Sequence, residues 1–340
     1  MKVLVTGGCG YIGSHTSIEL LKEDNELVIV DNLSNSHSSV IDVIEAISNK
    51  EVIFYELDIR DKKSMKEVFR NNNIDVVIHF AALKSISDSL IYTKEYFDIN
   101  VNGTKVLTEL VEEFNVDIFI FSSSAAVYGL PKKLPINENF NLKPTNPYAE
   151  TKMIGEEMCH ELYNSGCKKV FILRYFNPVG AHKTALLGEH FSNDSKNLVP
   201  LICNVLNGSM THIRVYGSDY NTNDGTGIRD YIHILDLAQG HVSALQTAKD
   251  NTSSFIETVN LGTGQGYSVM EIISAFEKIT EKEVPYMNVG RRDGDIESCY
   301  AGVELAKKVM NWSSKYDLDE MVADTWKWVL SGNNYRINKK

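Results

Sequence analysis

Six short apolar runs recur along the first half of the chain. They occupy residues 2–6, 26–30, 51–56, 75–80, 117–121 and 169–173. Runs of this length that are apolar at nearly every position are typical of strands buried on both faces of a parallel sheet. Patterns of helical period lie between them, for example at residues 12–23 and 104–114. Repeated strand–helix units predict an α/β fold with a doubly wound parallel sheet of the Rossmann type.

The pattern changes after about Asn177, where polar loops lengthen, as at residues 217–227. Further helical patterns lie at residues 235–248, 269–279 and 318–330. We predict a nucleotide-binding domain at residues 1–176 and a smaller α/β substrate-binding region at residues 177–340, from which the chain can cross back to the first domain. No linker rich in Pro, Gly or Ser separates the two, so we expect a packed boundary.

Composition and charge exclude several classes of function. Hydrophobic residues make up 43% and charged residues 23% of the 340 positions, and the net charge is −11. An acidic surface repels nucleic acid and anionic lipid, so we expect neither as a partner. No apolar run approaches the roughly 20 residues of a membrane span, and the N-terminal run is too short for a signal peptide.

The five cysteines are scattered and include no C-x-x-C pair. They are Cys9, Cys159, Cys167, Cys203 and Cys299. This pattern argues against a disulfide framework or a metal site and for a reducing compartment. We therefore expect a cytoplasmic protein without a structural metal.

A glycine-rich turn follows the first predicted strand and precedes the first predicted helix. Glycines at positions 7, 10 and 13 leave room for a tight turn and for a pyrophosphate at the helix N-terminus. Such a pattern alone is weak, because glycines also serve ordinary turns, but its position strengthens it. Asp31 ends the second predicted strand, 18 residues beyond Gly13. Its carboxylate suits the ribose hydroxyls of NAD and would repel the 2′-phosphate of NADP.

Three further residues form a possible acid–base site. Ser124 follows the fifth predicted strand, and Tyr148 and Lys152 lie four positions apart in a helical pattern. That spacing places the two side chains on one helix face. We expect the ammonium to lower the pKa of the phenol from its free value of ~10, so that Tyr148 removes a proton from a sugar hydroxyl that Ser124 orients. Each pattern alone is a common accident; their order along the chain, after the glycine turn, favours catalysis.

Together these motifs resemble extended short-chain dehydrogenases/reductases, and within them the UDP-galactose (UDP-glucose) 4-epimerase family. The matching motifs extend nearly from end to end: Gly10-Tyr11-Ile12-Gly13, Asp31-Asn32-Leu33, Asp58-Ile59-Arg60, His79-Phe80-Ala81, Asn100-Val101-Asn102-Gly103-Thr104, Ser122-Ser123-Ser124, Arg174-Tyr175-Phe176-Asn177-Pro178-Val179-Gly180, Asp224-Gly225-Thr226-Gly227, Arg229-Asp230-Tyr231-Ile232-His233 and Asn260-Leu261-Gly262. The resemblance implies an NAD-dependent isomerase, commonly dimeric through helices near residues 92–114 and 148–165.

The resemblance also assigns roles to single residues. The catalytic group would be Ser124, Tyr148 and Lys152. The NAD-binding group would be Gly7, Gly10, Tyr11, Ile12, Gly13, Asp31, Asn32, Asn35, Ser36, Asp58, Ile59, Phe80, Ala81, Ala82, Lys84, Asn100, Ser122, Tyr148, Lys152, Tyr175 and Phe176. The UDP-sugar would contact Lys84, Ser124, Tyr148, Phe176, Asn177, Asn197, Leu198, Val215, Tyr216, Arg229, Arg292, Asp295 and Cys299. The arginines suit a diphosphate, although each could instead form a surface ion pair with a nearby aspartate.

Some positions depart from the family pattern. Ile99 and Lys196 replace frequent asparagines, Ala82 replaces a frequent glycine, and Gly302 stands where aspartate is common. Cys299 replaces the tyrosine of many bacterial relatives. Its small side chain would leave room for an N-acetyl group, so we expect activity on UDP-N-acetylglucosamine and UDP-N-acetylgalactosamine too.

Two alternative functions use the same scaffold. A nucleotide-sugar 4,6-dehydratase needs an Asp-Glu acid–base pair directly after the serine, where this chain has Ala125 and Ala126. A non-catalytic NAD-sensing regulator would not need Ser124, Tyr148 and Lys152 together. Both alternatives therefore rank below the epimerase.

Overall fold

The apolar runs of the first half form most of one parallel sheet. Its strands are β1 (Lys2–Thr6), β2 (Glu26–Asp31), β3 (Ile53–Glu56), β4 (Val76–His79), β5 (Ile118–Ser124), β6 (Lys169–Tyr175) and β10 (Phe255–Leu261). They lie in the order β10-β6-β5-β4-β1-β2-β3, and all neighbours are parallel. The structure is a computed structural model that describes residues 1–191, 196–292 and 294–333. The predicted Rossmann-type sheet is confirmed.

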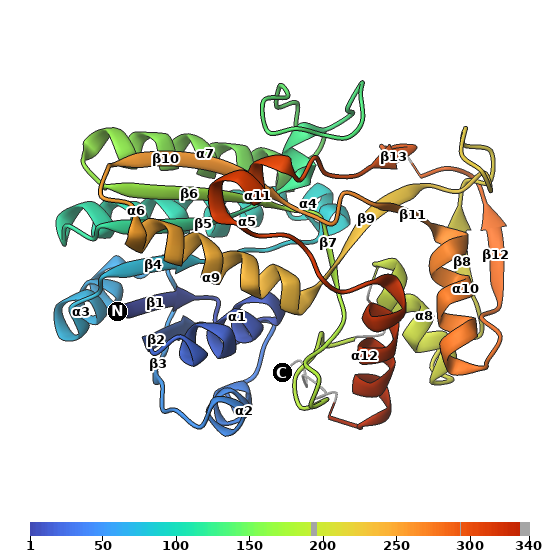
Figure 1. Cartoon of the computed structure of the whole chain (residues 1–340), viewed down its shortest axis with the longest axis horizontal. Coiled ribbons are helices and arrows are strands. Elements are labelled where there is room, and N and C mark those ends of the chain that lie inside the picture. Colours follow the sequence, from blue (N-terminus) through green and yellow to red (C-terminus); the bar gives the residue numbers. More distant parts are fainter. Residues whose placement is uncertain (192–195, 293, 334–340) are drawn as a thin grey trace.

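Helices cover both faces of this sheet, as Figure 1 shows. One face carries α1 (Tyr11–Lys22), α2 (Ser39–Ser48), α9 (Ile234–Asp250) and α11 (Glu304–Met310), and the other carries α3 (Lys62–Asn72), α6 (Gly103–Glu113) and α7 (Pro147–Ser165). Successive strand residues point to opposite faces, so Val3 and Val5 join the first core and Leu4 joins the second. This explains why the runs are apolar at every position.

The second half builds smaller sheets beyond the carboxyl edge of the large one. In the first, β9 (Ile228–His233) pairs with β7 (Asn177–Val179), β11 (Gly266–Ser268) and β13 (Ser298–Cys299). In the second, β8 (Ile213–Tyr216) pairs with β12 (Tyr286–Val289). Helices α8 (Leu198–Leu206), α10 (Val269–Thr280) and α12 (Leu318–Leu330) share a separate apolar core. These strands and helices form most of the right-hand part of the molecule in Figure 1.

Strand β10 comes from the second half of the sequence but lies in the large sheet. It pairs with β6 along its whole length, from Phe255 beside Lys169 to Leu261 beside Tyr175. The chain thus returns to the large sheet after forming β7, β8 and β9. A single boundary at residue 176 stays a prediction, and residues 334–340 of the predicted second region lie outside the described residues.

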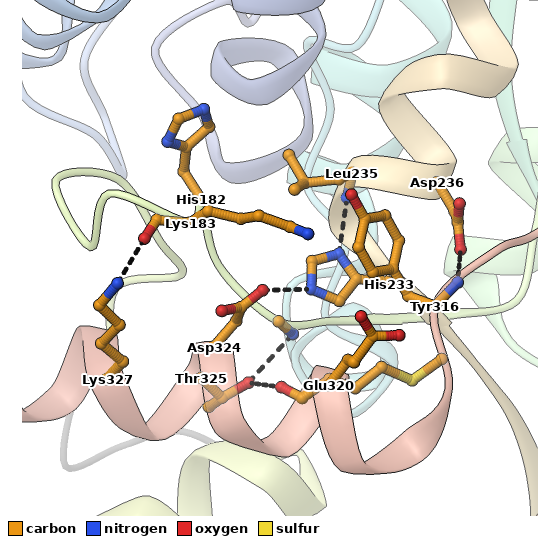
Figure 2. Close-up of polar contacts among 12 residues, drawn as sticks. His182, Lys183, His233, Leu235, Asp236, Tyr316, Glu320, Asp324, Thr325 and Lys327 are labelled. Atoms are coloured by element: carbon orange, nitrogen blue, oxygen red, sulfur yellow. Dashed lines mark hydrogen bonds and ion pairs between the residues drawn. The ribbon is translucent and has the colours of Figure 1, made fainter.

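A polar cluster fastens α12 to the ends of β7 and β9 in the first of the smaller sheets (Figure 2). The amide of Leu235 donates to Nδ1 of His233 at 3.0 Å, which leaves the proton of a neutral ring on Nε2, 3.2 Å from Asp324. The Thr325 hydroxyl accepts a hydrogen bond from the amide of Gly180 at 3.1 Å. Because the carbonyl of Gly180 accepts from the Tyr11 hydroxyl at 2.7 Å, α12 is linked through one peptide segment to the first turn of α1.

Over the described ranges, no helix is both long and apolar enough to cross a bilayer. All five cysteines are buried and free of disulfides.

Candidate active site

The predicted cofactor residues gather at the carboxyl edge of the large sheet. They follow β1, β2, β3 and β4, end β5 and β6, or lie on α7 and on the π-helix η1 (Phe97–Asn102). Carboxyl ends of parallel strands meet along one edge, where open α/β sheets bind their ligands. Residues far apart in the sequence are therefore neighbours here, such as Tyr11 and Gly180, which are 169 positions apart.

The glycine turn is shaped for close approach of a backbone. Gly7 has a φ of +71°, and a Cβ on it would lie 2.7 Å from the amide nitrogen of Ala81. Gly10 caps α1 without any side-chain hydrogen bond to the helix end. The first amides of α1 are therefore not blocked by a capping side chain, which is the arrangement that binds a phosphate.

Asp31 links the end of β2 to this turn. Its carboxylate accepts hydrogen bonds from the amide of Cys9 at 3.0 Å, the amide of Leu33 at 2.9 Å and the hydroxyl of Ser36 at 3.0 Å. Burial raises the pKa of Asp31, and the three hydrogen bonds act in the opposite direction. The carboxylate is thus fixed in place, with lone pairs left to accept from further donors.

Neighbouring candidates extend this edge. The Asn32 amide donates to Asp58 at 3.0 Å. Hydrogen bonds from Arg60 hold the pKa of Asp58 well below its usual range. Lys84 forms an ion pair with Glu189 at 2.9 Å and lies 5.8 Å from the centre of the Tyr11 ring. The first contact joins the ends of β2 and β3, and Lys84 brings the segment after β4 beside α1.

The acid–base candidates meet where β5 ends against α7. Ser124 is the last residue of β5 and hydrogen-bonds to the side chain of Tyr148. Lys152 lies one turn further along α7, and its ammonium donates to the carbonyl of Ser122 at 2.7 Å. Asn146 caps this helix by accepting from the amide of Ala149 at 2.9 Å, so the start of α7, and with it Tyr148, is fixed.

The expectation that the Lys152 ammonium lowers the pKa of Tyr148 is wrong for the charges of the protein itself. Burial raises the pKa of Tyr148, and the hydrogen bond from Ser124 opposes this. The ammonium of Lys152 lies against the carbonyl of Ser122 and 5.1 Å from the centre of the Phe121 ring, so the desolvation of the phenol prevails. Burial also lowers the pKa of Lys152 to about 8, while Cys159 and Glu156 act to raise it.

Asn100 has a role that its motif did not reveal. Its side-chain oxygen accepts from the amide of Leu83 at 2.8 Å, and its nitrogen donates to the carbonyl of Leu83 and the hydroxyl of Thr151, both at 3.0 Å. Thr151 donates in turn to the carbonyl of Tyr148 at 2.8 Å. Asn100 therefore joins the segment after β4 to α7, from a π-helical turn of the kind frequent at functional sites.

Apart from Lys84, Ser124, Tyr148 and Phe176, the predicted UDP-sugar residues lie in the second half of the chain. Asn177 is on β7, Leu198 begins α8 after the capping Asn197, Val215 and Tyr216 end β8, Arg229 is on β9, Arg292 and Asp295 precede β13, and Cys299 is on β13. Among the described residues, no side-chain hydrogen bond joins Asn177 or Asn197 to another of these candidates.

Two of the arginines converge on one carboxylate. Arg229 and Arg292 each lie 3.8 Å from a different oxygen of Asp295. The guanidinium of Arg292 also stacks over Tyr216, 4.0 Å from the ring centre. Two guanidiniums share one carboxylate, so this group carries local positive charge in an acidic protein.

Cys299 lies between the strand of Arg229 and the residues that follow Ser124. It pairs in register with Arg229 and is 9% exposed. It belongs to a small apolar cluster with Phe176 and Val127, against which Ala125 packs. The next residue, Tyr300, lies instead near Gly266 of β11. Position 299 therefore faces the same interior as the residues that follow Ser124.

Two further departures from the family pattern, Lys196 and Gly302, have visible contacts or a visible fit. Lys196 forms an ion pair with Asp88 of α4 (Ile86–Ile91). Gly302 donates its amide to the carbonyl of Ile136 at 2.7 Å, and a Cβ on it would lie 1.9 Å from the Asn137 side chain. Nothing in the described structure explains Ile99 or Ala82.

Comparison with known proteins identifies the family. A family model described as GDP-mannose 4,6 dehydratase matches residues 4–325. The UDP-glucose 4-epimerase of Bacillus subtilis is 45% identical over 335 residues, which cover 98% of each chain, and that of Drosophila melanogaster is 45% identical over 345 residues, which cover 99% of each. The chain belongs to the UDP-glucose 4-epimerase family.

Solved structures of this epimerase family agree over the whole fold. The enzyme from Stenotrophomonas maltophila with bound NAD and formylated UDP-arabinopyranose has a TM-score of 0.94 at 44% identity, covering 97% of this chain and 98% of that one. The enzyme from Bifidobacterium longum in complex with NAD+ and UDP has a TM-score of 0.93 at 43% identity, covering 98% of this chain and 99% of that one.

Across the described residues of this chain, no group of His, Cys, Asp or Glu could hold a metal ion.

Proposed function

We propose that this chain interconverts UDP-galactose and UDP-glucose by transient oxidation at C4 of the sugar. The observation that carries this proposal is the meeting of Ser124 with Tyr148, on a helix that also holds Lys152, at the edge where the glycine turn opens α1. The named activity of relatives that are 45% identical over nearly the full chain supports the same reaction.

NAD fits the residues of this edge. The side-chain-free turn at Gly7 and Gly10 suits the pyrophosphate, and the fixed carboxylate of Asp31 suits the ribose hydroxyls. The other predicted NAD contacts follow the same strand ends, and Lys152 and Ser122 would lie beside the nicotinamide ribose. When bound, NAD would supply the acceptor and donor of a hydride at sugar C4 and a positive charge beside Tyr148.

Proton transfer falls to the protein's own groups. Tyr148 takes the proton of the C4 hydroxyl as that carbon is oxidised, and Ser124 holds the oxygen in line. The 4-keto sugar turns over, and Tyr148 returns the proton when C4 is reduced from its other face. Lys152 stabilises the phenolate while its ammonium is charged. The proton and the hydride both return, so the reaction is redox-neutral.

The nucleotide diphosphate would bind at the arginines. Arg229 and Arg292 are already gathered by Asp295 and offer planar donors to phosphate oxygens. Tyr216, stacked with Arg292, would lie beside the base with Val215, while Asn177, Asn197 and Leu198 would line the remaining wall. The Bifidobacterium longum relative binds UDP, which supports a nucleoside diphosphate as part of the ligand.

A 4,6-dehydratase is the second candidate, because the matching family model carries that description. The chemistry of the strand end opposes it: Ala125 and Ala126 follow Ser124 in the helix η2 (Ala125–Tyr128) and exchange no protons. The regulator hypothesis is weaker still, since the whole acid–base group is present.

We further propose that N-acetylated sugars are accepted. Cys299 lies in the apolar cluster with Phe176, and Tyr300 lies toward Gly266, away from that cluster. A small side chain at 299 leaves room that a tyrosine ring would fill.

Two broader proposals concern assembly and location. The family resemblance favours a homodimer formed by helices near residues 92–114 and 148–165, which sedimentation velocity would test. Five buried, unpaired thiols favour a reducing compartment and hence the cytoplasm.

The proposed function is tested by NMR of the purified, NAD-loaded protein with UDP-galactose. We expect an equilibrium mixture of UDP-galactose and UDP-glucose with no net change in the cofactor. Loss of water from the sugar would support the dehydratase, and absence of turnover with full NAD occupancy would support the regulator.

A further inference from the structure

A buried polar network lies directly behind the acid–base residues. Glu156 is on α7, one turn beyond Lys152, and Arg174 is on β6. The Arg174 guanidinium donates to both carboxylate oxygens, from Nε at 2.9 Å and from Nη2 at 2.6 Å. Both side chains are almost completely buried, at 6% and 5% exposed.

The carboxylate is also bound from the strand that carries Ser124. Ser123 donates its hydroxyl to Glu156 at 2.5 Å, and it lies opposite Arg174 in the pairing of β5 with β6. Glu156 therefore holds the ends of both strands at the position immediately before the catalytic serine. A shift of this carboxylate would move Ser124 and α7 relative to each other.

The far end of Arg174 continues the network. Its Nη1 donates to the hydroxyl of Tyr128 at 2.9 Å, and Tyr128 donates to Asn260 of β10 at 2.7 Å. Every polar group of the pair thus has a partner. A buried ion pair is weak support for stability, because well-packed apolar residues do as well. Its place behind the catalytic residues points to a role in the reaction.

The charge of Glu156 also acts on Lys152. The titratable groups that interact with the ammonium are Glu156 and Cys159 on α7 and His79 from β4. Burial lowers the pKa of Lys152 to about 8, with Cys159 and Glu156 acting to raise it. A buried thiol stays neutral, so Glu156 is the carboxylate among these groups that favours the charged lysine.

We propose that Glu156, held by Arg174 and Ser123, is a positioning residue that aligns the end of β5 with α7 and keeps Lys152 charged. This inference rests on the proposed catalytic roles of Ser124, Tyr148 and Lys152. Glu156 touches no substrate; it acts through the serine on one side and the lysine on the other.

The test is the pH profile of kcat for UDP-galactose in wild type and Glu156→Gln. Lysine is charged below its pKa, so activity that depends on the ammonium is present at lower pH and is lost as pH rises through that value. Removing the carboxylate lowers the pKa of Lys152, and the alkaline limb should move down by roughly one pH unit. At pH 8 kcat should then fall about fivefold, because the charged fraction of lysine drops from about one half to about one tenth.

Ser123→Ala is the matched variant, because it removes one hydrogen bond and keeps the charge. It should lower kcat several-fold while its alkaline limb stays at the wild-type pH. Wild-type kcat in Ser123→Ala would overturn the alignment role, and an unmoved limb in folded Glu156→Gln would overturn the electrostatic role.

Glu156→Gln leaves Arg174 buried without a counter-charge and can fail to fold. The double variant Glu156→Gln/Arg174→Gln removes both charges, and its limb should still move down; a folded double variant with the wild-type limb would contradict the proposal. Tyr148→Phe separates the two hypotheses: if it keeps full activity, the proposed function fails whatever position 156 does.

Discussion

The two sides of the candidate site are built in different ways. On the glycine-turn side, Asp31 and Lys152 are buried, and their hydrogen bonds are already made within the protein. The arginine side, formed by Tyr216, Arg229, Arg292 and Asp295, consists of partly exposed charges at longer separations. The first side is preorganised for one shape of cofactor. The guanidinium groups of the second side can donate further hydrogen bonds to an anionic ligand.

This difference predicts which property of the enzyme changes when residues on each side are substituted. Changes on the glycine-turn side should affect the chemical step or the choice of cofactor. Changes on the arginine side should affect mainly the affinity for the nucleotide-sugar. Four substitutions test that division, beginning with the largest expected effect.

Tyr148→Phe removes the acid–base hydroxyl and keeps the ring. We expect kcat to fall at least ~10²-fold with NAD still bound, since acid–base groups contribute that much. Steady-state rates with UDP-galactose and the NAD content of the purified protein measure both parts. Tyr163→Phe, on the same helix, is the control and should match wild type; similar rates in the two variants would remove Tyr148 from the mechanism.

Arg292→Ala should raise KM for UDP-galactose about 10- to 100-fold with a small change in kcat, since a hydrogen bond to a charged group contributes about 1.5–3 kcal/mol. The neighbouring Arg291, which pairs with Asp219 at 2.8 Å, offers a matched control. Arg291→Ala should leave KM within twofold of wild type. Equal effects of the two substitutions would mean that general surface charge, and not the Arg292 site, binds the diphosphate.

Cys299→Tyr should sharpen the choice of sugar. We expect turnover of UDP-N-acetylgalactosamine to fall about tenfold or more while UDP-galactose turnover is kept, because a packed site does not absorb several extra heavy atoms without strain. Paired assays of both sugars measure the ratio, and Cys299→Ala should keep both activities. A wild-type protein that ignores the acetylated sugar would refute the role of position 299.

Asp31→Ala should weaken NAD and relax discrimination against NADP by a few-fold or more, because the repulsion of the 2′-phosphate is lost. Competition between the two cofactors during reconstitution measures this ratio. Asp24→Ala, which removes an exposed pair with Lys50, should leave the ratio unchanged. An unchanged ratio in Asp31→Ala would show that Asp31 only shapes the turn.

Local patterns predicted the fold well. The first strand has the predicted bounds, and Ser124 lies beside Tyr148, one helical turn from Lys152, while the catalytic roles of the three residues stay a prediction. Strand β10 was not predicted because its first four residues are only half-buried at the edge of the sheet, so its sequence mixes Glu257 and Thr258 with apolar residues.

Long-range contacts set the rest of the site. No local sequence pattern predicts that Asn100 joins Leu83 to Thr151, or that two arginines share Asp295. One signal for Glu156 was present: it continues the four-residue spacing of Tyr148 and Lys152 and so shares their helix face. The direction of the Tyr148 pKa depended on burial, which the spacing alone does not contain.

The most direct test of C4 epimerisation follows an isotope. UDP-galactose with deuterium at sugar C4 is incubated with the NAD-loaded protein in ordinary water, and the product is analysed by NMR. The account predicts UDP-glucose with the deuterium still at C4, because the hydride that leaves that carbon returns to it. Deuterium at C6 of a dehydrated sugar, or its loss to solvent, would contradict the account.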